Sequence, residues 1–261
     1  NYISLGSSQN YLSLIVRSII ISLCYIFKTG NLRTLINTIK TIFLLNKKQL
    51  QQENLNQSIK LINPDIIHVQ WQSLVPWCEE FLLEEKYKII LSQRGYQSNV
   101  RPFVNQENLD YLQQWYPKVD GFHSVSNAIS KTGDQIYHSE SKIDKVVYSG
   151  FDFNELCFNS NYKKQNVLQI LSVGRPHWIK GYDDALKACS ILKQKGIDFH
   201  YTIVGASKNN EEILYLINCL GLESHIQLID KIAQDEVYHY MNKSNVLIFP
   251  SIMEGLPNVV V

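Results

Sequence analysis

The sequence predicts an α/β protein made of two Rossmann-like, doubly wound domains, each built on a parallel sheet. Short runs rich in β-branched apolar residues alternate with helical patterns along most of the 261 residues. These runs are almost continuously apolar, as in strands that helices cover on both faces. Apolar residues make up 45% of the chain and charged residues only 19%, which is enough apolar material for two packed cores.

The first half of the chain contains four strand patterns and two helical patterns between them. The expected helices cover 75–85 and 127–137. The apolar runs are short and β-branched, which favours strands over helices. The expected strands are 65–69, 88–91, 121–125 and 145–148.

The second half repeats this alternation after a polar segment, 149–166, that has neither a helical nor a strand period. We therefore predict a first domain over 1–150, a connection over 151–166 and a second domain over 167–261. The expected strands of the second domain are 167–173, 199–205, 225–229 and 245–250, and its expected helices are 182–195, 210–220 and 234–241.

The N-terminal segment is basic and apolar. Six of the 25 Lys and Arg residues, but none of the 24 acidic residues, lie in the first 50 positions. Residues 11–27 form an apolar run that Arg17 interrupts, at the short limit for a membrane span. Residues 31–48 predict an amphipathic basic helix. Two interpretations stay open: a core-facing helix pair, or peripheral contact of residues 11–48 with an anionic membrane.

Several classes of protein do not fit the pattern. The five cysteines are spread along the chain without a CxxC pair, which indicates buried thiols in a reducing compartment. The seven histidines lack metal-ligand spacing, so we expect no metal site. No strand is followed by a dinucleotide-binding or P-loop glycine motif. No aromatic-basic interleaving or RNA-binding motif accompanies the basic segment, so nucleic acid is not expected as a partner.

Candidate site residues lie in the loops that follow the strands of the second half, where open α/β sheets bind ligands. The loop after Val173 reads "GRPHWIKG" and contains Arg175 and Lys180 beside an expected helix start. Two cations at a helix N-terminus make an anion site, because backbone N–H groups add to the side-chain charge. The alternative is that both are ordinary surface charges.

The last loop, "PSIMEG", adds a carboxylate at the same edge of the sheet. Glu254 comes directly before Gly255, which leaves room for a ligand beside the backbone. A carboxylate beside two cations suits a ligand with both hydroxyl and phosphate groups. The residues therefore favour a nucleotide sugar.

The ordered segments "VGRPHWIKG", "YTIVG", "LGLESHIQLID" and "VYHYMNKSNVLIFPSIMEGLPNVVV" resemble the donor half of the retaining family 4 glycosyltransferases of the GT-B fold. Within that family the chain is most similar to enzymes that build bacterial capsule, exopolysaccharide or lipopolysaccharide. The resemblance covers 167–261 almost continuously. "NPDIIHVQW" and "DGFHSVSNAIS" resemble the acceptor half more loosely, and "YSGFDFNEL" resembles the crossing between the halves.

The resemblance implies roles for named residues. Arg175 and Lys180 would hold the donor diphosphate, a task that other glycosyltransferases give to a divalent metal, and Glu254 would lie by the donor sugar. The second glutamate of the family motif would fall just past Val261, and the chain opens on a helical pattern where the family has a strand and its loop, so we expect that both domains are incomplete in this chain. The donor-binding positions implied are Gly174, Lys231, Ile232, Gly255 and Leu256, with Lys231 and Ile232 facing the base.

One position departs from the family pattern. After the strand "KIILSQ" the family commonly has His-Gly, whereas this chain has Arg94-Gly95. Arginine cannot act as a general base near neutral pH because its pKa lies above about 12. Arg94 could still bind the sugar or the diphosphate, or it is a local structural charge. We assign Arg94 and Gly95 to the sugar and acceptor side.

The resemblance implies a metal-independent hexosyltransferase. It would move a sugar from a nucleotide-diphosphate donor to a glycan or lipid-linked acceptor, with retention of anomeric configuration and without a cofactor. The expected location is the cytoplasm or the inner face of the plasma membrane. The alternative function is a non-catalytic GT-B scaffold that binds nucleotide sugars. For the 261-residue chain itself we expect weak or absent turnover.

Overall fold

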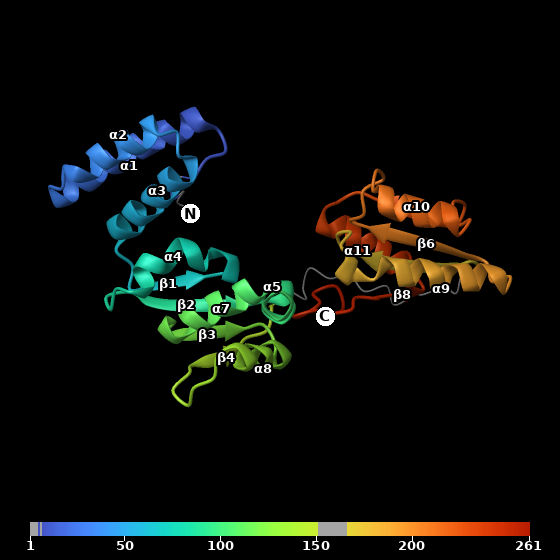
Figure 1. Cartoon of the computed structure of the whole chain (residues 1–261). Coiled ribbons are helices and arrows are strands. Elements are labelled where there is room, and N and C mark those ends of the chain that lie inside the picture. The colour runs from blue at the N-terminus through green and yellow to red at the C-terminus, as the bar shows by residue number, and fades with distance from the viewer. Residues whose placement is uncertain (1–4, 6, 151–165) are drawn as a thin grey trace. The chain divides into compact units, whose positions relative to one another are not determined.

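The structure is a computed structural model that describes residue 5, residues 7–150 and residues 166–261. Contacts divide the chain into two compact units, one of Asn1–Gln93 with Arg101–Val146 and one of Arg94–Val100 with Val147–Val261. Each unit carries its own four-stranded sheet (Figure 1). All strand pairs are parallel, which confirms the predicted α/β class. The predicted connection 151–166 lies, except for Asn166, outside the described residues.

The first sheet has the order β1-β2-β3-β4, so consecutive strands are neighbours. Its core contains Phe81, Leu91, Leu112, Tyr116 and Ile136, all buried between the sheet and its helices. The strands are β1 (Ile66–Val69), β2 (Lys88–Gln93), β3 (Gly121–Ser124) and β4 (Asp144–Val146). The helices are α1 (Tyr11–Thr29), α2 (Arg33–Phe43), α3 (Lys47–Ile62), η1 (Gln72–Leu74), α4 (Val75–Leu82), α6 (Arg101–Val104), α7 (Gln106–Trp115), η2 (Tyr116–Lys118) and α8 (Asn127–Ile136).

A partly buried polar network links the last residues of β2 and β3 to Asp144, the first residue of β4, and to α8. The Asp144 carboxylate accepts hydrogen bonds from Gln93 at 3.3 Å, Ser124 at 3.1 Å and Ser130 at 3.0 Å. A Cβ atom at Gly133 would lie 2.1 Å from the Gln93 amide oxygen, so only glycine lets α8 approach β2 this closely. Protein groups therefore occupy this part of the sheet edge.

The second sheet has the order β7-β6-β5-β8. Its core includes Leu171, Leu186, Tyr201, Ile203 and Leu222, each fully buried. The strands are β5 (Leu168–Val173), β6 (Phe199–Val204), β7 (Ile226–Ile229) and β8 (Val246–Leu247). The helices are α5 (Gly95–Asn99), η4 (Trp178–Lys180), α9 (Tyr182–Gln194), α10 (Glu211–Cys219) and α11 (Gln234–Lys243).

The structure differs from the expected elements at a few places. β8 is shorter than the expected 245–250, although the backbone N–H of Ile248 still donates to the carbonyl of Leu171 at 2.9 Å. Of the cysteines expected to be buried, Cys24 and Cys219 are exposed, and Cys157 lies outside the described residues. Cys78 and Cys189 are buried, and burial raises the pKa of each thiol to about 11.

The core-facing interpretation of the N-terminal helices is wrong. Phe27 is 90% exposed on α1, and Phe43 is 82% exposed on α2. The large apolar side chains of both helices point mainly to the outside of the first unit. The side chains that these helices bury are instead mostly small and polar.

Candidate active site

The second sheet has a topological switch point between β5 and β8. From β5 the chain moves outward through β6 to β7, and it then returns to place β8 on the other side of β5. In open parallel sheets a ligand crevice lies at such a point, outside the carboxyl ends of the two strands. The loops that follow β5 and β8 therefore flank the expected crevice. They carry Arg175, Lys180 and Glu254, the residues singled out from the sequence.

The two loops pack directly on each other. The backbone N–H of Ile252 donates to the carbonyl of Ile179 at 2.8 Å. Gly181 has φ +64°, and a Cβ atom there would lie 2.2 Å from the carbonyl oxygen of Pro250. Below them, the Ser172 hydroxyl donates to the carbonyl of Ile248 at 2.7 Å. These contacts fix the distance between the loops.

Lys180 and Glu254 form an ion pair between the loops that follow β5 and β8. The Nζ atom of Lys180 lies 2.6 Å from Oε1 of Glu254, and each side chain is 24% exposed. The ammonium group also lies 5.4 Å from the centroid of the Phe249 ring. The sequence suggested separate roles for these two residues, and their mutual contact was not predicted. A lysine ammonium has three N–H donors, so it can bind a further anion beside the carboxylate.

Gly174 lies at the base of the β5 loop. The hydroxyl of Tyr182 donates to the carbonyl of Gly174 at 2.8 Å, and a Cβ atom at Gly174 would lie 3.0 Å from that hydroxyl oxygen. Burial raises the pKa of Tyr182, and the nearby Glu254 carboxylate raises it further, so the phenol stays protonated. Arg175 is exposed, and within the described residues it has no hydrogen-bond or ion-pair partner.

The contacts of the segment Arg94–Val100 assign it to the second unit. Asn99 donates from its side-chain amide to the backbone carbonyl of Glu254 at 3.1 Å. The Tyr96 ring lies edge-on to that of His177, with centroids 5.8 Å apart. Arg94 precedes α5 in extended backbone and is half-buried, and Gly95 has φ +45°. The sequence pointed to Arg94 and Gly95, but not to Tyr96 or Asn99.

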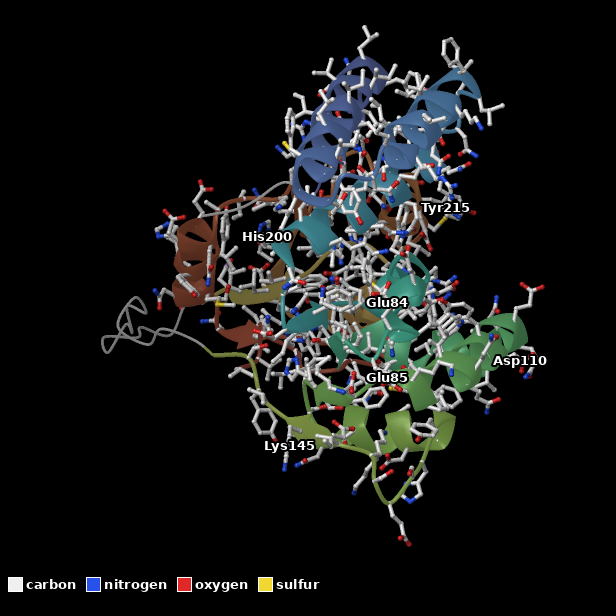
Figure 2. All side chains as sticks on the ribbon, turned by 90° about the vertical axis from the view of Figure 1, so that its left-hand side faces the viewer. Glu84, Glu85, Asp110, Lys145, His200 and Tyr215 are labelled. Atoms are coloured by element: carbon white, nitrogen blue, oxygen red, sulfur yellow. The ribbon has the colours of Figure 1, made fainter. Side chains whose placement is uncertain are left out.

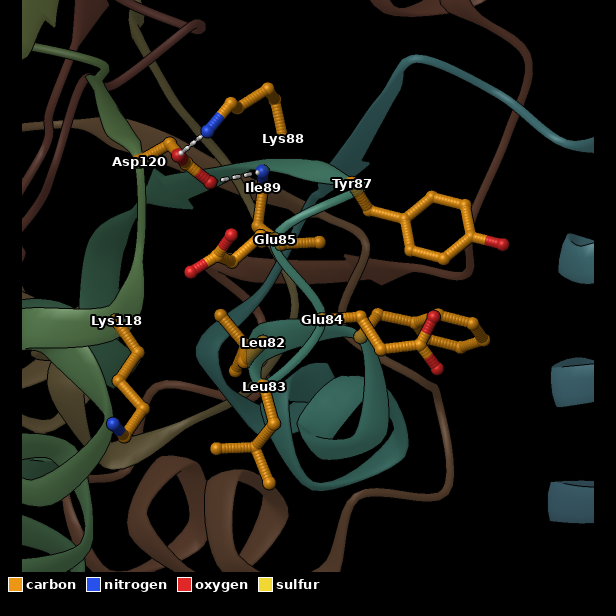
Figure 3. A pocket seen from close by; sticks show the side chains of 10 residues that line it. Leu82, Leu83, Glu84, Glu85, Tyr87, Lys88, Ile89, Lys118 and Asp120 are labelled. Atoms are coloured by element: carbon orange, nitrogen blue, oxygen red, sulfur yellow. Dashed lines mark hydrogen bonds and ion pairs between the residues drawn. The ribbon is translucent and has the colours of Figure 1, made fainter.

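A cavity of about 440 Å³ lies in the first unit, at the amino ends of the strands of the first sheet (Figure 3). Its mouth contains Lys88, the first residue of β2, and Asp120, which precedes β3. Asp120 accepts hydrogen bonds from the Lys88 ammonium and from the backbone N–H of Ile89, both at 2.9 Å. Burial favours a raised pKa for Asp120, but these hydrogen bonds outweigh it and hold the pKa below the usual value. Because the cavity opens at the amino ends of the strands, it is not our candidate site.

A cavity of about 820 Å³ opens beside the crevice at the carboxyl ends of β5 and β7. It brings together Lys231 and Ile232, which the resemblance placed near the base, with Val173 at the end of β5. Most of its walls are apolar, which suits a flat ring system. The sequence did not predict the remaining lining residues: Ala233, Gln234, Val237, Tyr238, Met241, Asn242, Asn258, Val259, Val260 and Val261.

Gly255 and Leu256 are half-buried in the stretch that leads from Glu254 towards this cavity.

Within the described residues, no group of three or more His, Cys, Asp or Glu side chains is placed to hold a metal ion. His68 and His123 share the buried hydroxyl of Ser92, at 2.8 and 2.9 Å, and this contact links three neighbouring strands of the first sheet.

Comparison with known proteins agrees with this geometry. Residues 154–261 match the family described as "Glycosyl transferases group 1". The chain is 35% identical over 96 residues to the amylovoran biosynthesis glycosyltransferase AmsK of Erwinia amylovora, which covers 34% of this chain and 24% of that relative. It is 28% identical over 123 residues to the capsular polysaccharide biosynthesis glycosyltransferase CapH of Staphylococcus aureus, covering 46% and 33% respectively. The chain thus spans about a quarter to a third of the length of these relatives.

Solved structures show the same fold. A sucrose-phosphate synthase from Thermosynechococcus elongatus matches with a TM-score of 0.65 at 13% identity, over 80% of this chain and 57% of that one. The pneumococcal O-GlcNAc transferase GtfA, solved with UDP and GlcNAc, matches with a TM-score of 0.62 at 15% identity, over 80% and 42%. These likenesses confirm the predicted GT-B fold class. The second part of the chain is therefore similar to glycosyltransferases of group 1, and the relatives that it matches include glycosyltransferases of bacterial polysaccharide synthesis.

Proposed function

We propose that the protein is a glycosyltransferase of bacterial cell-surface polysaccharide synthesis. In this proposal it moves a hexose from a nucleotide-diphosphate sugar to a hydroxyl group of a glycan or lipid-linked acceptor, with retention of configuration. The observation that carries the proposal is the Lys180–Glu254 pair at the switch-point crevice, with the exposed Arg175 on the same loop. The match to the group 1 family and to relatives with this activity supports it.

The proposed roles follow from the charges. The bond between the sugar carbon and the diphosphate oxygen breaks while the acceptor oxygen bonds to that carbon, and the acceptor proton leaves with the diphosphate. Arg175 and Lys180 stabilise the negative charge that develops on the leaving diphosphate, so no divalent metal is required. Glu254 accepts hydrogen bonds from the hydroxyl groups of the transferred sugar, and Arg94 and Gly95 lie on the sugar and acceptor side.

The cavity beside the crevice is the proposed nucleoside site. Its apolar walls suit a base, and Lys231 and Ile232 lie where the base would contact backbone. Gly174, Gly255 and Leu256 line the path between this cavity and the crevice in the proposal. The neighbour GtfA, which was solved with UDP, supports a nucleoside diphosphate as the class of ligand.

The first unit is the proposed acceptor-binding unit. There a groove of about 520 Å³ is lined mainly by apolar side chains, among them Leu55, Ile59, Ile67, Leu74 and Trp77. An apolar groove of this kind suits the lipid part of a lipid-linked acceptor. Such acceptors lie in a membrane, so we propose a cytoplasmic protein that works at the inner face of the plasma membrane.

Calorimetric titration with UDP, GDP, ADP and dTDP tests the donor site. We expect one of these to bind, and we expect Arg175→Ala to weaken that binding by about tenfold or more, because a charged hydrogen bond is lost. Lys195→Ala is the matched control, since Lys195 is an exposed cation at the far end of α9 and should leave binding unchanged. If none of the four binds, or if both variants bind like the wild type, the proposed donor site is wrong.

A transfer assay with radiolabelled sugar donors and bacterial lipid and glycan extracts tests turnover. The proposal expects Arg175-dependent incorporation of sugar into the extract. Nucleotide binding without incorporation into any acceptor, by the 261-residue chain and by any longer protein that contains it, would instead favour the non-catalytic scaffold.

A further inference from the structure

The helical hairpin α1–α2 has an apolar outer face. Its large apolar side chains recur every three or four residues along each helix, which aligns them on one side. In Figure 2 the side chains of these helices, on the dark blue ribbons, project outward from the first unit. We call this surface the hairpin face; it consists of Leu12, Val16, Ile19, Ile20, Leu23 and Phe27 of α1, of Leu32, which directly precedes α2, and of Ile36, Ile39 and Phe43 of α2, each at least 37% exposed.

The buried side of the same hairpin is polar. The hydroxyl of Ser22 lies 2.8 Å from that of Thr38 and donates to the Gln57 amide oxygen of α3 at 3.0 Å. Nearby, Thr41 donates to Glu53 at 2.6 Å, and Ser18 donates to a backbone carbonyl of its own helix. The hairpin is thus held to α3 largely by small polar side chains.

This distribution is the reverse of what water favours. Large apolar side chains in water lose about 1.5–3 kcal/mol each relative to burial, so a contiguous row of ten indicates a covered surface. Helices that pack through small and polar residues, with apolar side chains facing outward, are typical of a lipid environment. The hairpin face therefore suits the hydrocarbon side of a membrane interface.

The basic residues around the hairpin face favour a membrane with anionic lipids. Arg33 and Lys40 lie one helical turn from Ile36 on α2, at the rim of the apolar row, and both are exposed. On α1, Arg17 donates to the carbonyl of Ser7 and Lys28 to the carbonyl of Leu61, and no acidic residue occurs before Glu53. Cations beside an apolar helix face attract anionic lipid headgroups. They also disfavour a second copy as the occupant, because two such faces would bring like charges together.

We propose that the hairpin face inserts into the headgroup and upper acyl layer of an anionic lipid bilayer, with α1 and α2 lying parallel to the membrane surface. By length and composition α1 could cross a membrane, and it is the one described helix that could. A spanning α1, however, would separate Ser22 from Thr38 and Gln57 and break both of these hydrogen bonds. Insertion of the intact hairpin keeps the network. This inference does not depend on the proposed transferase activity.

Vesicle flotation of the 261-residue chain tests the proposal. The probes are vesicles of phosphatidylethanolamine with phosphatidylglycerol, and vesicles of phosphatidylcholine alone. We expect flotation with the anionic vesicles and little with the neutral ones. Phe27→Gln/Phe43→Gln should lower the partition coefficient by at least about tenfold, because two large apolar contacts with lipid are lost. Arg33→Gln/Lys40→Gln should lower it about tenfold on anionic vesicles only.

Leu83→Gln/Val104→Gln is the matched control. Both side chains are exposed apolar residues of the first unit outside the hairpin, at 63% and 72% exposure, and their replacement should leave flotation unchanged. Circular dichroism and thermal melting of each variant verify that it folds. We expect all variants to fold, because the substituted side chains are exposed. Equal flotation of the phenylalanine variant and the wild type would overturn the proposal. So would a dimer in solution that fails to bind vesicles and that the phenylalanine variant converts to monomer, since a second copy would then cover the face.

Discussion

Gly181 illustrates how single residues hold the crevice together. It ends the turn η4 with φ +64° and directly precedes α9, so it decides where Lys180 emerges from the backbone. A side chain here would be strained by the left-handed conformation and would also strike the carbonyl of Pro250. Gly196 has a similar φ of +68°, but nothing lies within 4 Å of its Cβ position.

Alanine substitutions at the two glycines distinguish the cost of backbone strain from the cost of a steric clash. We expect Gly196→Ala to lower the free energy of unfolding of the second unit by about 1 kcal/mol, from strain alone. Gly181→Ala should cost about 2–4 kcal/mol, because the β5 and β8 loops must also move apart. Urea unfolding followed by circular dichroism measures both. Equal losses would show that the contact with Pro250 is not limiting.

At this scale the sequence identified the residues but not their geometry. Arg175, Lys180 and Glu254 could be selected because their loops follow parallel strands, whose carboxyl ends share one edge. The 74-residue separation of Lys180 and Glu254 left their contact open, since it depends on how two loops pack. Tyr96 and Asn99 gave no signal, because isolated aromatic and amide residues occur throughout the chain.

The elements show where local patterns suffice. All eight strands of the described residues lie where short apolar runs predicted them, with ends shifted by a few residues. Helices α3 and α7 and the short helices α5 and α6 were not predicted. The sequence of α3, "KKQLQQENLNQSIKLI", has few apolar positions, and it is held by buried amides such as Asn54 and Gln57 that no hydrophobic period reports. The helical pattern also left open whether the apolar side of α2 faces a core or a membrane, because amphipathicity shows that a face exists but not what covers it.

The polar interior of the hairpin reverses the usual effect of an apolar substitution. Thr38→Val keeps the shape of a fully buried side chain, but it removes the hydroxyl that contacts Ser22 at 2.8 Å and Gln57 at 3.4 Å. We expect a loss of about 1–2 kcal/mol in the free energy of unfolding of the first unit. Thr34→Val on the same helix should change stability by less than about 0.5 kcal/mol. Thermal melting of both variants tests this, and a Thr38→Val protein as stable as the wild type would contradict it.

Across the whole molecule, two separate cores imply two unfolding events. The first unit is built around Phe81 and Leu91, and the second around Leu171 and Tyr201, with no residue shared between the two cores. Units with their own cores unfold with separate transitions when the interface between them is weak. Ligand binding then reports on the unit that it stabilises.

Differential scanning calorimetry with the best-binding nucleoside diphosphate tests where the donor site lies. At a ligand concentration about a hundredfold above Kd, binding stabilises the folded state by about 2.7 kcal/mol. We expect this increment in the transition of the second unit only, because the crevice and its neighbouring cavity both lie there. A shift confined to the other transition would place the nucleotide in the first unit and contradict the assignment.

The Lys180–Glu254 pair also bears on selectivity among anions. Glu254 lies on a loop that is hydrogen-bonded to the loop of Lys180, so its carboxylate is present at the ammonium at a high effective concentration. Free chloride or inorganic phosphate must compete with this tethered anion, whereas a diphosphate can engage Lys180 and Arg175 together. In the proposed donor site, the Glu254 carboxylate therefore competes with any incoming anion for the Lys180 ammonium. If Lys180 and Arg175 hold the donor diphosphate as proposed, this competition disfavours simple anions more than it disfavours a nucleotide sugar.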